Sequence, residues 1–233
     1  MPGPLEHSSP KAARILAAAG ELLVTRGSTG VTIAEVARRA HIGKGTVYLY
    51  WKTKEDLLLE LLCRDFLDLA DTLIAEITAD PDLARPSRLY PRLLRNTAER
   101  PFVYAMQSGS SDLLGVLADD PRSARLLGNL GPDALTHGVL PIWRRHHLAR
   151  TDWEPADQAF VLRALGMGFL SITEGRKDAS VDRLCGAAVT ALLGPEEATA
   201  SQVEAAAAEG VQELAEARSA ALAVISDPAP AVR

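Results

Sequence analysis

A short stretch near the start of the chain carries lysine, threonine and tyrosine side chains at helical spacing. If a helix begins at Lys44, its side chain and that of Tyr48 point outward one turn apart. Val47 and Trp51 then point inward and hold the helix in place. Exposed ammonium and hydroxyl groups donate to phosphate oxygens, a lysine reaches guanine O6 and N7, and the methyl group of Thr46 can meet that of thymine. The chemistry available to this stretch is recognition of nucleic acid, and the alternative is a polar helix face that is simply solvated.

The residues just before this helix predict how it is positioned. Thr32 starts a second short helix, and Glu35 three residues later completes a capping-box pattern. The run His41-Ile42-Gly43 predicts a tight turn, in which Ile42 fills the core and Gly43 relieves the backbone. Two short helices joined by such a turn form a helix-turn-helix, whose second helix suits the major groove of DNA.

Longer helices are predicted on both sides of this pair. Ser9 and Pro10 are typical of an N-cap and a first helical position, so a helix is expected from Pro10 to about Arg26. Thr53 caps another helix over about residues 54–79, which would be roughly 39 Å long. A helix of that length can leave the helix-turn-helix and run into the rest of the protein.

The remaining chain is helical in pattern and is interrupted by prolines. Neither strand alternation nor a hairpin pattern occurs, so the sequence predicts an all-α protein. The last predicted helix is Ala- and Glu-rich and amphipathic, with Gly210 weakening its middle. The expected helical segments are about 87–99, shorter pieces over 101–118, a helix or pair over 122–149 kinked at Pro141, and then 155–175, 180–193 and 195–226.

Charge is distributed unevenly along the 233 residues, whose formal net charge is −5. The first 54 residues contain eight Lys or Arg and three Glu, a net of +5, so the remainder carries −10. A basic head on an acidic body suits a head that meets phosphate. With 47% apolar residues, the chain is expected to be globular. Cys63 and Cys185 lack CxxC spacing and are expected to be buried free thiols.

The run TIAEVARRAHIGKGTVYLYWKTKEDLL, preceded by RGSTGVT, resembles the DNA-binding region of the tetracycline-repressor (TetR) family of bacterial regulators. The resemblance is continuous from about Lys11 to Leu58 and rests on spacing, caps, turn, aromatic residues and a closing lysine. The rest of the chain carries no motif of that family and is similar to it in helical character and length alone. His41 occupies a position where the family frequently has glycine, and histidine tolerates a left-handed backbone better than most residues.

The resemblance implies specific roles for residues of the helix-turn-helix. Thr32, Tyr48 and Lys54 are expected to bind phosphate, while residues 43–46 read bases and Tyr50 occupies a variable contact position. Trp51 stands where the family has a core aromatic residue and is expected to be structural. The implied DNA contacts are Thr32, Gly43, Lys44, Gly45, Thr46, Tyr48, Tyr50 and Lys54.

The resemblance also implies a small-molecule pocket and a dimer interface in the body. Aromatic and soft side chains in the middle of the body are candidate pocket residues, although ordinary core packing is the alternative for each. Because few of them are polar, a hydrophobic or aromatic ligand is expected. Residues of about 155–193 would form the dimer interface, possibly extended by 195–226, with Gly166 and Gly168 allowing close approach between or within subunits. The candidate ligand residues are Tyr90, Phe102, Met106, His137, Trp143 and Phe169.

These patterns, together with what the resemblance implies, predict a cytoplasmic, homodimeric repressor that binds a palindromic operator and is released by a small effector. No run is apolar enough to span a membrane, and no secretory signal, catalytic motif or metal-binding pattern is present, so no enzyme activity, cofactor or metal is expected. The run from Arg144 to His147 is expected to be a solvated helix end. Two rivals are a helical enzyme or carrier with a vestigial head, and an interaction protein that uses residues 195–226. The expected organisation is a flexible arm at 1–9, a helix-turn-helix domain at 10–56, an effector and dimerisation domain at 57–226, and a disordered tail at 227–233.

Overall fold

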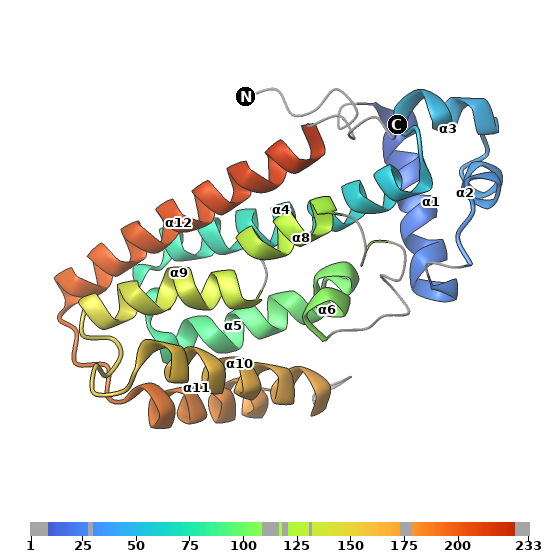
Figure 1. The fold of residues 1–233 in the computed structure, drawn as a ribbon. Coiled ribbons are helices and arrows are strands. Elements are labelled where there is room, and N and C mark those ends of the chain that lie inside the picture. Colours follow the sequence, from blue (N-terminus) through green and yellow to red (C-terminus); the bar gives the residue numbers. More distant parts are fainter. Residues whose placement is uncertain are drawn as a thin grey trace.

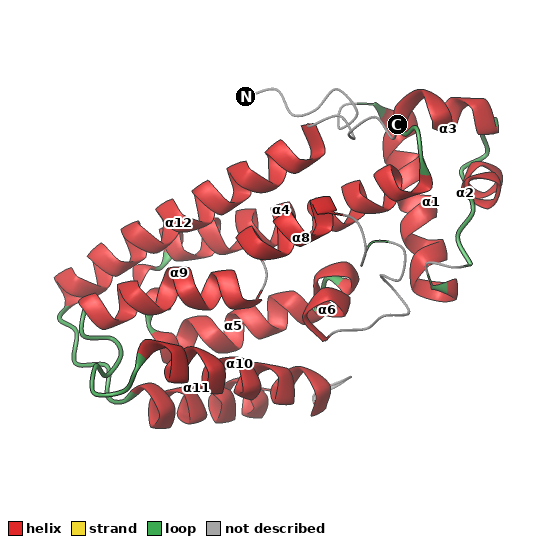
Figure 2. Cartoon of the chain, in the orientation of Figure 1, coloured by secondary structure: helices red, strands yellow, loops and turns green. Residues whose placement is uncertain are grey.

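The structure, a computed structural model, describes residues 9–27, 30–108, 117, 121–130, 132–172 and 179–226. Every regular element in these ranges is a helix, which confirms the predicted all-α class (Figure 2). The predicted arm, except Ser9, and the predicted tail lie outside the described residues. In the described part of the chain, no helix is long and apolar enough to cross a membrane.

Four helices build the head and its exit into the body, namely α1 (Pro10–Arg26), α2 (Ile33–Arg39), α3 (Lys44–Tyr50) and α4 (Lys54–Ala79). Ser9 caps α1 through its hydroxyl oxygen, which accepts from the backbone N–H of Ala12 at 3.4 Å. At the start of α4, Thr53 and Asp56 form a reciprocal capping box. Both ends of α4 agree with the sequence prediction, and Figure 1 shows this helix running from the head into the body.

Prolines begin most of the elements of the body. A proline at the first helical position lacks only an N–H that would be unpaired there, so it starts a helix without cost. The predicted segment at 122–149 is therefore a pair of helices, and Pro141 lies inside the second of them. The body elements are the 3₁₀-helix η2 (Pro81–Ala84), α5 (Pro86–Ala98), α6 (Pro101–Ser108), α8 (Pro121–Leu130), α9 (Pro132–Arg145), α10 (Pro155–Ile172), α11 (Ala179–Leu193) and α12 (Ala200–Ser226).

Two groups of helices lie on opposite sides of the body. Figure 1 shows α12 (red) along one side, and α10 and α11 (orange-brown) along the other. α12 packs against α4, η2, α8 and α9, whereas α11 packs against α5 and α10. The last helix thus packs into the core of the chain. This packing argues against the expectation that 195–226 extends a dimer interface formed by 155–193.

The apolar core is continuous from the head into the body through α4. Leu57, Leu58 and Leu62 of α4 are fully buried and join the α1–α3 core to that of the body. Trp51, the predicted core aromatic residue, is buried and donates from its indole nitrogen to the Glu60 carboxylate at 2.6 Å. The other oxygen of that buried carboxylate accepts from the Arg64 guanidinium at 2.8 and 3.0 Å. This pairing satisfies a buried charge that would otherwise be costly.

Candidate DNA-binding surface and effector cavity

The exposed face of α3 includes a residue that the prediction left out. Val47 is fully buried, as expected, and Lys44, Gly45 and Tyr48 are exposed. Leu49, which sequence reasoning left out, is 83% exposed against 45% for Tyr48. In the sequence, a leucine at helical spacing resembles a core residue. Its exposure in the structure is what identifies Leu49 as a candidate contact. An apolar side chain on this face can contact the methyl group of thymine.

The turn between α2 and α3 takes its left-handed residue at His41 and not at the glycine. His41 has φ 54°, while Gly43 has φ −73° and ψ 144°, an extended conformation open to any residue. The predicted backbone role of Gly43 is therefore wrong. The N–H of His41 donates to Arg38 O at 3.2 Å and that of Ile42 to Ala37 O at 3.0 Å, which is the Schellman pattern of a helix end.

The predicted capping box at α2 is only half formed. The Thr32 hydroxyl oxygen accepts from the N–H of Glu35 at 3.2 Å, and its own proton is left to donate elsewhere. The Glu35 carboxylate instead accepts from Arg38 at 2.9 Å and Arg26 at 2.7 Å, which lowers its pKa. Charge-assisted bonds to two guanidinium groups are stronger than one bond from a backbone N–H, so they draw this side chain away from the cap.

Tyr50 turns back toward α1. Its hydroxyl lies 2.9 Å from the Ser9 hydroxyl, and its ring stacks at a tilt on Trp51, with 5.5 Å between centroids. This geometry argues against a DNA contact through the Tyr50 hydroxyl. A Cβ added to Gly45 would meet nothing within 4 Å, so the exposed side of α3 is open at that point.

Two cations flank the exposed face of the head. The Lys44 ammonium lies 5.7 Å from the centroid of the Tyr48 ring, where a weak cation–π attraction orients both side chains. Lys54 is the first residue of α4, at a helix N-terminus whose dipole favours anions. Arg39 pairs with Glu21, and Arg26 and Arg38 pair with Glu35, so these three cations of the head are already engaged by carboxylates.

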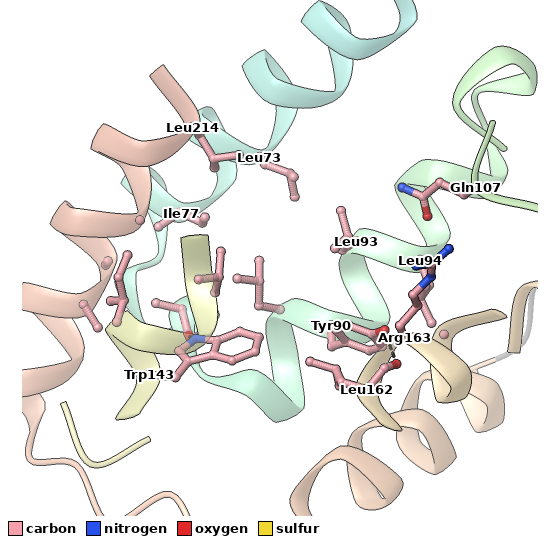
Figure 3. A pocket seen from close by; sticks show the side chains of 18 of the residues that line it. Leu73, Ile77, Tyr90, Leu93, Leu94, Gln107, Trp143, Leu162, Arg163 and Leu214 are labelled. Carbon is pink, nitrogen blue, oxygen red and sulfur yellow. Dashed lines mark hydrogen bonds between the residues drawn. The ribbon is translucent and has the colours of Figure 1, made fainter. Parts of the chain in front are cut away.

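A cavity of about 70 Å³ lies inside the body, enclosed mainly by α4, α5, α9, α10 and α12 (Figure 3). Its walls are almost entirely apolar, and the polar side chains of Gln107 and Arg163 lie together on one side of it. The Trp143 indole nitrogen donates to Ala84 O at 2.8 Å, and the Tyr90 hydroxyl donates to Leu162 O at 2.6 Å. These two aromatic side chains are thereby fixed in position around the cavity.

The candidate ligand residues do not form one group. Tyr90 and Trp143 line the cavity. Phe102 is buried at the joint with the head, where its ring would be 3.7 Å from a Cβ added to Gly20 of α1. His137 is exposed on α9, and Phe169 packs against the core without lining the cavity. The side chain of Met106 lies outside the described residues.

Several cavity residues were not predicted because their sequence pattern is that of ordinary core residues. Leu73 and Ile77 belong to the apolar stripe of α4, and Leu214 to that of α12. A stripe shows that a side chain faces inward but does not distinguish a packed position from the wall of a cavity. The complete lining is Leu73, Ile77, Ala84, Leu89, Tyr90, Leu93, Leu94, Gln107, Val139, Ile142, Trp143, Leu162, Arg163, Gly166, Met167, Leu170, Ala206, Ala207, Gly210 and Leu214.

Two kinds of buried titratable group lie outside this cavity lining. Burial raises the pKa of both thiols, Cys63 and Cys185, to about 12, so they are neutral and unreactive near pH 7. Burial also raises the pKa of Asp65 to about 6, although its carboxylate accepts from the N–H of Phe102 at 3.0 Å. Asp65 thus joins α4 to the first turn of α6. Among the described residues, no cluster of His, Cys, Asp or Glu could hold a metal ion.

A second hollow, lined by residues of α4, η2, α5 and α11, is charged and not apolar. Its arginines are already engaged, since Arg88 pairs with Asp80 and Asp82, and Arg92 pairs with Glu76. The balance of opposite charges makes it a set of structural ion pairs at the junction of these elements. It offers no unpaired charge to a ligand.

Large apolar side chains are exposed on the outer face of α10 and α11. Phe160 is 73% and Ile172 76% exposed, and Met167 and Leu184 are also exposed. Exposed apolar side chains on two neighbouring helices make this face a candidate interaction surface. Gly166 has a different role, because an added Cβ would overlap the Tyr90 hydroxyl and lie 3.3 Å from Tyr90 Cζ. Its close packing is with α5.

The run from Arg144 to His147 is not a simple solvated helix end, contrary to the prediction. Arg144 donates to the carbonyl oxygens of Thr151 and Trp153 at 3.2 and 3.0 Å. His146 bonds the Glu209 carboxylate of α12 at 2.8 Å, and Arg145 pairs with the same carboxylate. These side chains hold the end of α9 to the loop that follows it and to α12. The residue of α12 lies 63 and 64 positions further along the chain.

Comparisons with known proteins agree with this architecture. The family model for bacterial regulatory proteins of the tetR family matches residues 15–61. The chain is 35% identical over 57 residues to the fatty acid metabolism regulator protein of Bacillus subtilis, a match over 24% of this chain and 29% of that protein. It is 28% identical over 157 residues to the transcriptional repressor NemR of Escherichia coli K12, covering 66% of this chain and 79% of NemR.

Solved structures show the same fold. A TetR-family regulator from Mesorhizobium loti superposes with a TM-score of 0.56 at 20% identity, over 80% of this chain and 98% of that one. A regulator of the same family from Shewanella gives a TM-score of 0.54 at 19% identity, over 79% of this chain and 96% of that one. With the family model and the curated relatives, these neighbours lead to one conclusion. The chain belongs to the TetR family of bacterial transcriptional regulators, and the family match at residues 15–61 coincides with its helix-turn-helix.

Proposed function

We propose that this protein is a homodimeric repressor that binds a palindromic operator and is released from it by a small hydrophobic or aromatic effector. One observation carries the proposal. Helix α4 begins soon after α3 ends and, toward its far end, contributes Leu73 and Ile77 to the apolar cavity. A single rigid element therefore connects the candidate DNA-reading surface to the candidate effector site.

The head would dock with α3 in the major groove. Residues 43–46 would read base edges, and Leu49 adds an apolar contact at the centre of the same exposed face. Thr32, Tyr48 and Lys54 surround that face and would bind phosphates, which fix the register of the protein on the duplex. Tyr50 is left out of this set because its hydroxyl bonds Ser9.

The effector would be mainly apolar. The cavity walls are aliphatic and aromatic side chains, and both Tyr90 and Trp143 already use their polar atoms in bonds to backbone carbonyls. Gln107 and Arg163 supply the polar side of the cavity and would orient a ligand that has one polar end (Figure 3). Pockets of this kind take their affinity from apolar area and their specificity from a few polar groups.

The dimer would form through α10 and α11. Their exposed apolar residues, including Phe160 and Ile172, give the two-fold interface a core that a monomer would leave in water. A symmetric dimer presents two copies of α3, which fit successive major grooves about 34–36 Å apart. An effector that binds more tightly to a dimer whose two α3 helices do not match the spacing of successive major grooves would shift the population away from the DNA-bound state.

Selection of bound sequences from a random duplex pool tests the DNA part of this proposal. A palindrome with half-sites about one helical turn apart is expected for the dimer. Tyr48→Phe should weaken binding to every selected sequence, whereas Lys44→Ala should change the preferred bases. Arg150→Ala, which removes a cation paired with Asp152 on a loop of the body, is the matched control and should bind as the wild type does. A protein that binds apolar ligands but selects no duplex would instead be a carrier.

A further inference from the structure

We propose that α12 is a wall of the effector cavity and that its Gly210 determines how large an apolar group the cavity accepts. The inference rests on the proposed function only in taking the ligand of the cavity to be an effector. The cavity and its wall are features of the structure. The family model ends at residue 61, so no part of it describes α12. The sequence resemblance likewise assigns this helix no role.

The inner face of α12 has two parts. Val203 and Ala221 are buried against the rest of the subunit, toward the two ends of the helix. Between them, Ala206, Ala207 and Gly210 line the cavity together with Leu214. The cavity is therefore bounded here by small side chains and by the helix backbone, and α12 is part of the enclosure.

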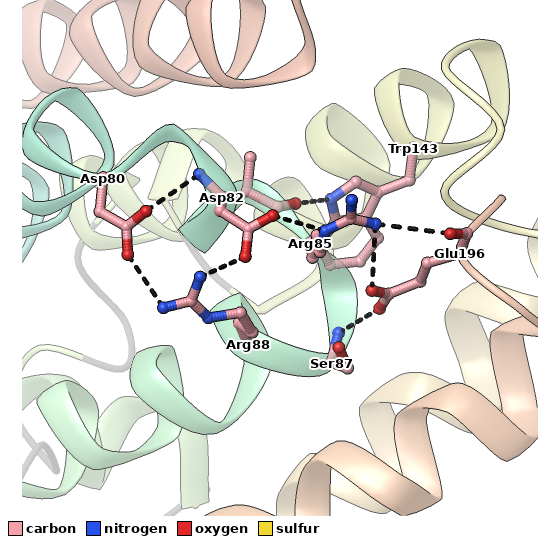
Figure 4. A network of polar contacts seen from close by, with 8 residues as sticks. Asp80, Asp82, Arg85, Ser87, Arg88, Trp143 and Glu196 are labelled. Carbon is pink, nitrogen blue, oxygen red and sulfur yellow. Dashed lines mark hydrogen bonds and ion pairs between the residues drawn. The ribbon is translucent and has the colours of Figure 1, made fainter. Parts of the chain in front are cut away.

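The segment before α12 is anchored to the start of α5. The carboxylate of Glu196 accepts from the backbone N–H of Ser87 at 2.7 Å and lies 3.8 Å from the Arg85 guanidinium. Arg85 also donates to Glu196 O at 3.4 Å and to Asp82 at 2.6 Å (Figure 4). A carboxylate that receives an N–H from the first turn of a helix is stabilised by the helix dipole. The network fixes where α12 begins.

Two further contacts hold α12 along its length. Glu209 bonds His146 at 2.8 Å, which ties the helix to α9, and Arg218 pairs with Asp71 of α4 at 2.6 Å. α5, α9 and α4 are themselves walls of the cavity. The position of α12 relative to the other walls is thus determined by contacts on three of them, so the cavity has a defined width at Gly210.

Gly210 is the wall position at which a substituted side chain would extend into the cavity. A Cβ added there would meet nothing within 4 Å, whereas a Cβ added to Gly166, across the cavity in α10, would overlap the Tyr90 hydroxyl. Glycine in the middle of a helix lowers stability relative to alanine. At Gly210 the absence of a side chain leaves free volume beside the apolar walls.

The arrangement also orients the effector. Figure 3 shows Trp143 and Leu214 toward the α12 side of the cavity, and Gln107 and Arg163 on the other side. A ligand would place its apolar end, an aryl ring or a short alkyl group, against Gly210 and its polar end near Arg163. A larger residue at Gly210 would shorten the apolar end that fits.

The test compares Gly210→Leu with Ala208→Leu, which places the same side chain at an exposed position two residues away on the same helix. Benzene serves as the probe, because a dry cavity lined by aliphatic and aromatic side chains in a folded protein can bind it. Titration followed by NMR should show benzene binding by the wild type and by Ala208→Leu, and at least about tenfold weaker binding by Gly210→Leu, which is roughly 1.4 kcal/mol. Operator affinity should stay within about twofold of the wild type in both variants.

Gly210→Ala guards against a folding defect, because alanine favours the helix and fills less of the cavity. It should bind benzene with intermediate affinity. Equal benzene affinity in wild type and Gly210→Leu, or no binding by the wild type, would overturn the assignment. If benzene binding depends on residue 210 but no apolar compound ever weakens operator binding, the cavity wall stands and the proposed release mechanism fails.

Discussion

The head and the body of this protein arrange their functional residues in opposite ways. In the head, Lys44, Tyr48 and Leu49 are exposed on one seven-residue helix, and nearby caps and turns set their directions. In the body, the cavity is enclosed by helices whose contributions span residues 73 to 214. A surface that reads DNA is built locally, whereas a cavity exists only where distant helices meet. Substitutions in the two regions should therefore separate DNA binding from ligand binding.

The largest effect is expected for Trp51→Ala in the head. It removes a large buried side chain and the indole donor that pairs with Glu60, so the free energy of unfolding should fall by about 3–5 kcal/mol. Operator binding should be lost with it, because α3 packs through this residue. Urea unfolding followed by circular dichroism and a gel-shift assay measure the two effects.

Trp51→Phe is the companion variant, since it retains much of the volume but not the donor. A loss smaller than that of the alanine variant, about 1–3 kcal/mol, is expected because the Glu60 carboxylate keeps Arg64 as its partner. If Trp51→Ala unfolded with wild-type stability, the head would not depend on this buried contact, and the contrast with the body would be weaker than proposed.

Gly166→Ala is the corresponding change in the body. The new methyl group would displace the Tyr90 side chain and break its hydrogen bond to Leu162 O, at a cost of about 1–3 kcal/mol. Gly168→Ala on the same helix meets nothing within 4 Å and should be neutral or stabilising. Calorimetric melting of the two variants decides between these outcomes. Equal melting temperatures would mean that the cavity wall is loosely packed.

Asp65→Asn should reveal a pH dependence at the joint between the two regions. The pKa of Asp65 is raised from 3.8 to about 6 in the folded state, so the folded protein binds this proton more tightly than the unfolded chain. Stability from this group is present below about pH 4 and is lost as the pH rises through about 6. The amide oxygen of the variant would still accept from the Phe102 N–H without the buried charge, so the variant should be more stable at pH 7 by on the order of 1–2 kcal/mol. Urea midpoints from pH 4 to 8 test this, and a wild-type-minus-variant difference that is flat with pH would contradict it.

Lys54→Ala is expected to have the smallest effect. Removal of one phosphate contact should reduce the slope of log K against log salt by about one unit, with similar losses on all operator sequences. Protein stability should stay near that of the wild type. A change in sequence preference would move Lys54 from the phosphate-binding set to the base-reading set. Binding isotherms at several salt concentrations, with Arg150→Ala as control, make the measurement.

Local signals in the sequence predicted the head well. The ends of α1 and α4, the Thr53 cap and the burial of Val47 and Trp51 are confirmed. The errors occurred where two local solutions compete. The Glu35 carboxylate pairs with arginines in place of the cap, and the left-handed turn residue is His41 and not Gly43.

Prediction in the body succeeded for helices but not for the cavity. Hydrophobic periodicity located α5, α10 and α11 within a few residues. It could not separate Tyr90 and Trp143, which line the cavity, from Phe102 and Phe169, which pack elsewhere. Both kinds of residue are apolar and face inward, so the difference between them depends on what lies opposite.

Caps, turns and apolar spacing act over a few residues, so the helix-turn-helix, its family, the all-α class and the length of α4 follow from the chain alone. Contacts in the folded protein set the exposure of Leu49, the return of Tyr50 to α1 and the placement of α12 against α4, η2, α8 and α9. These outcomes depend on residues far apart in the chain, such as Glu196 with Ser87 and Arg218 with Asp71. No local pattern specifies which distant partner a side chain will meet.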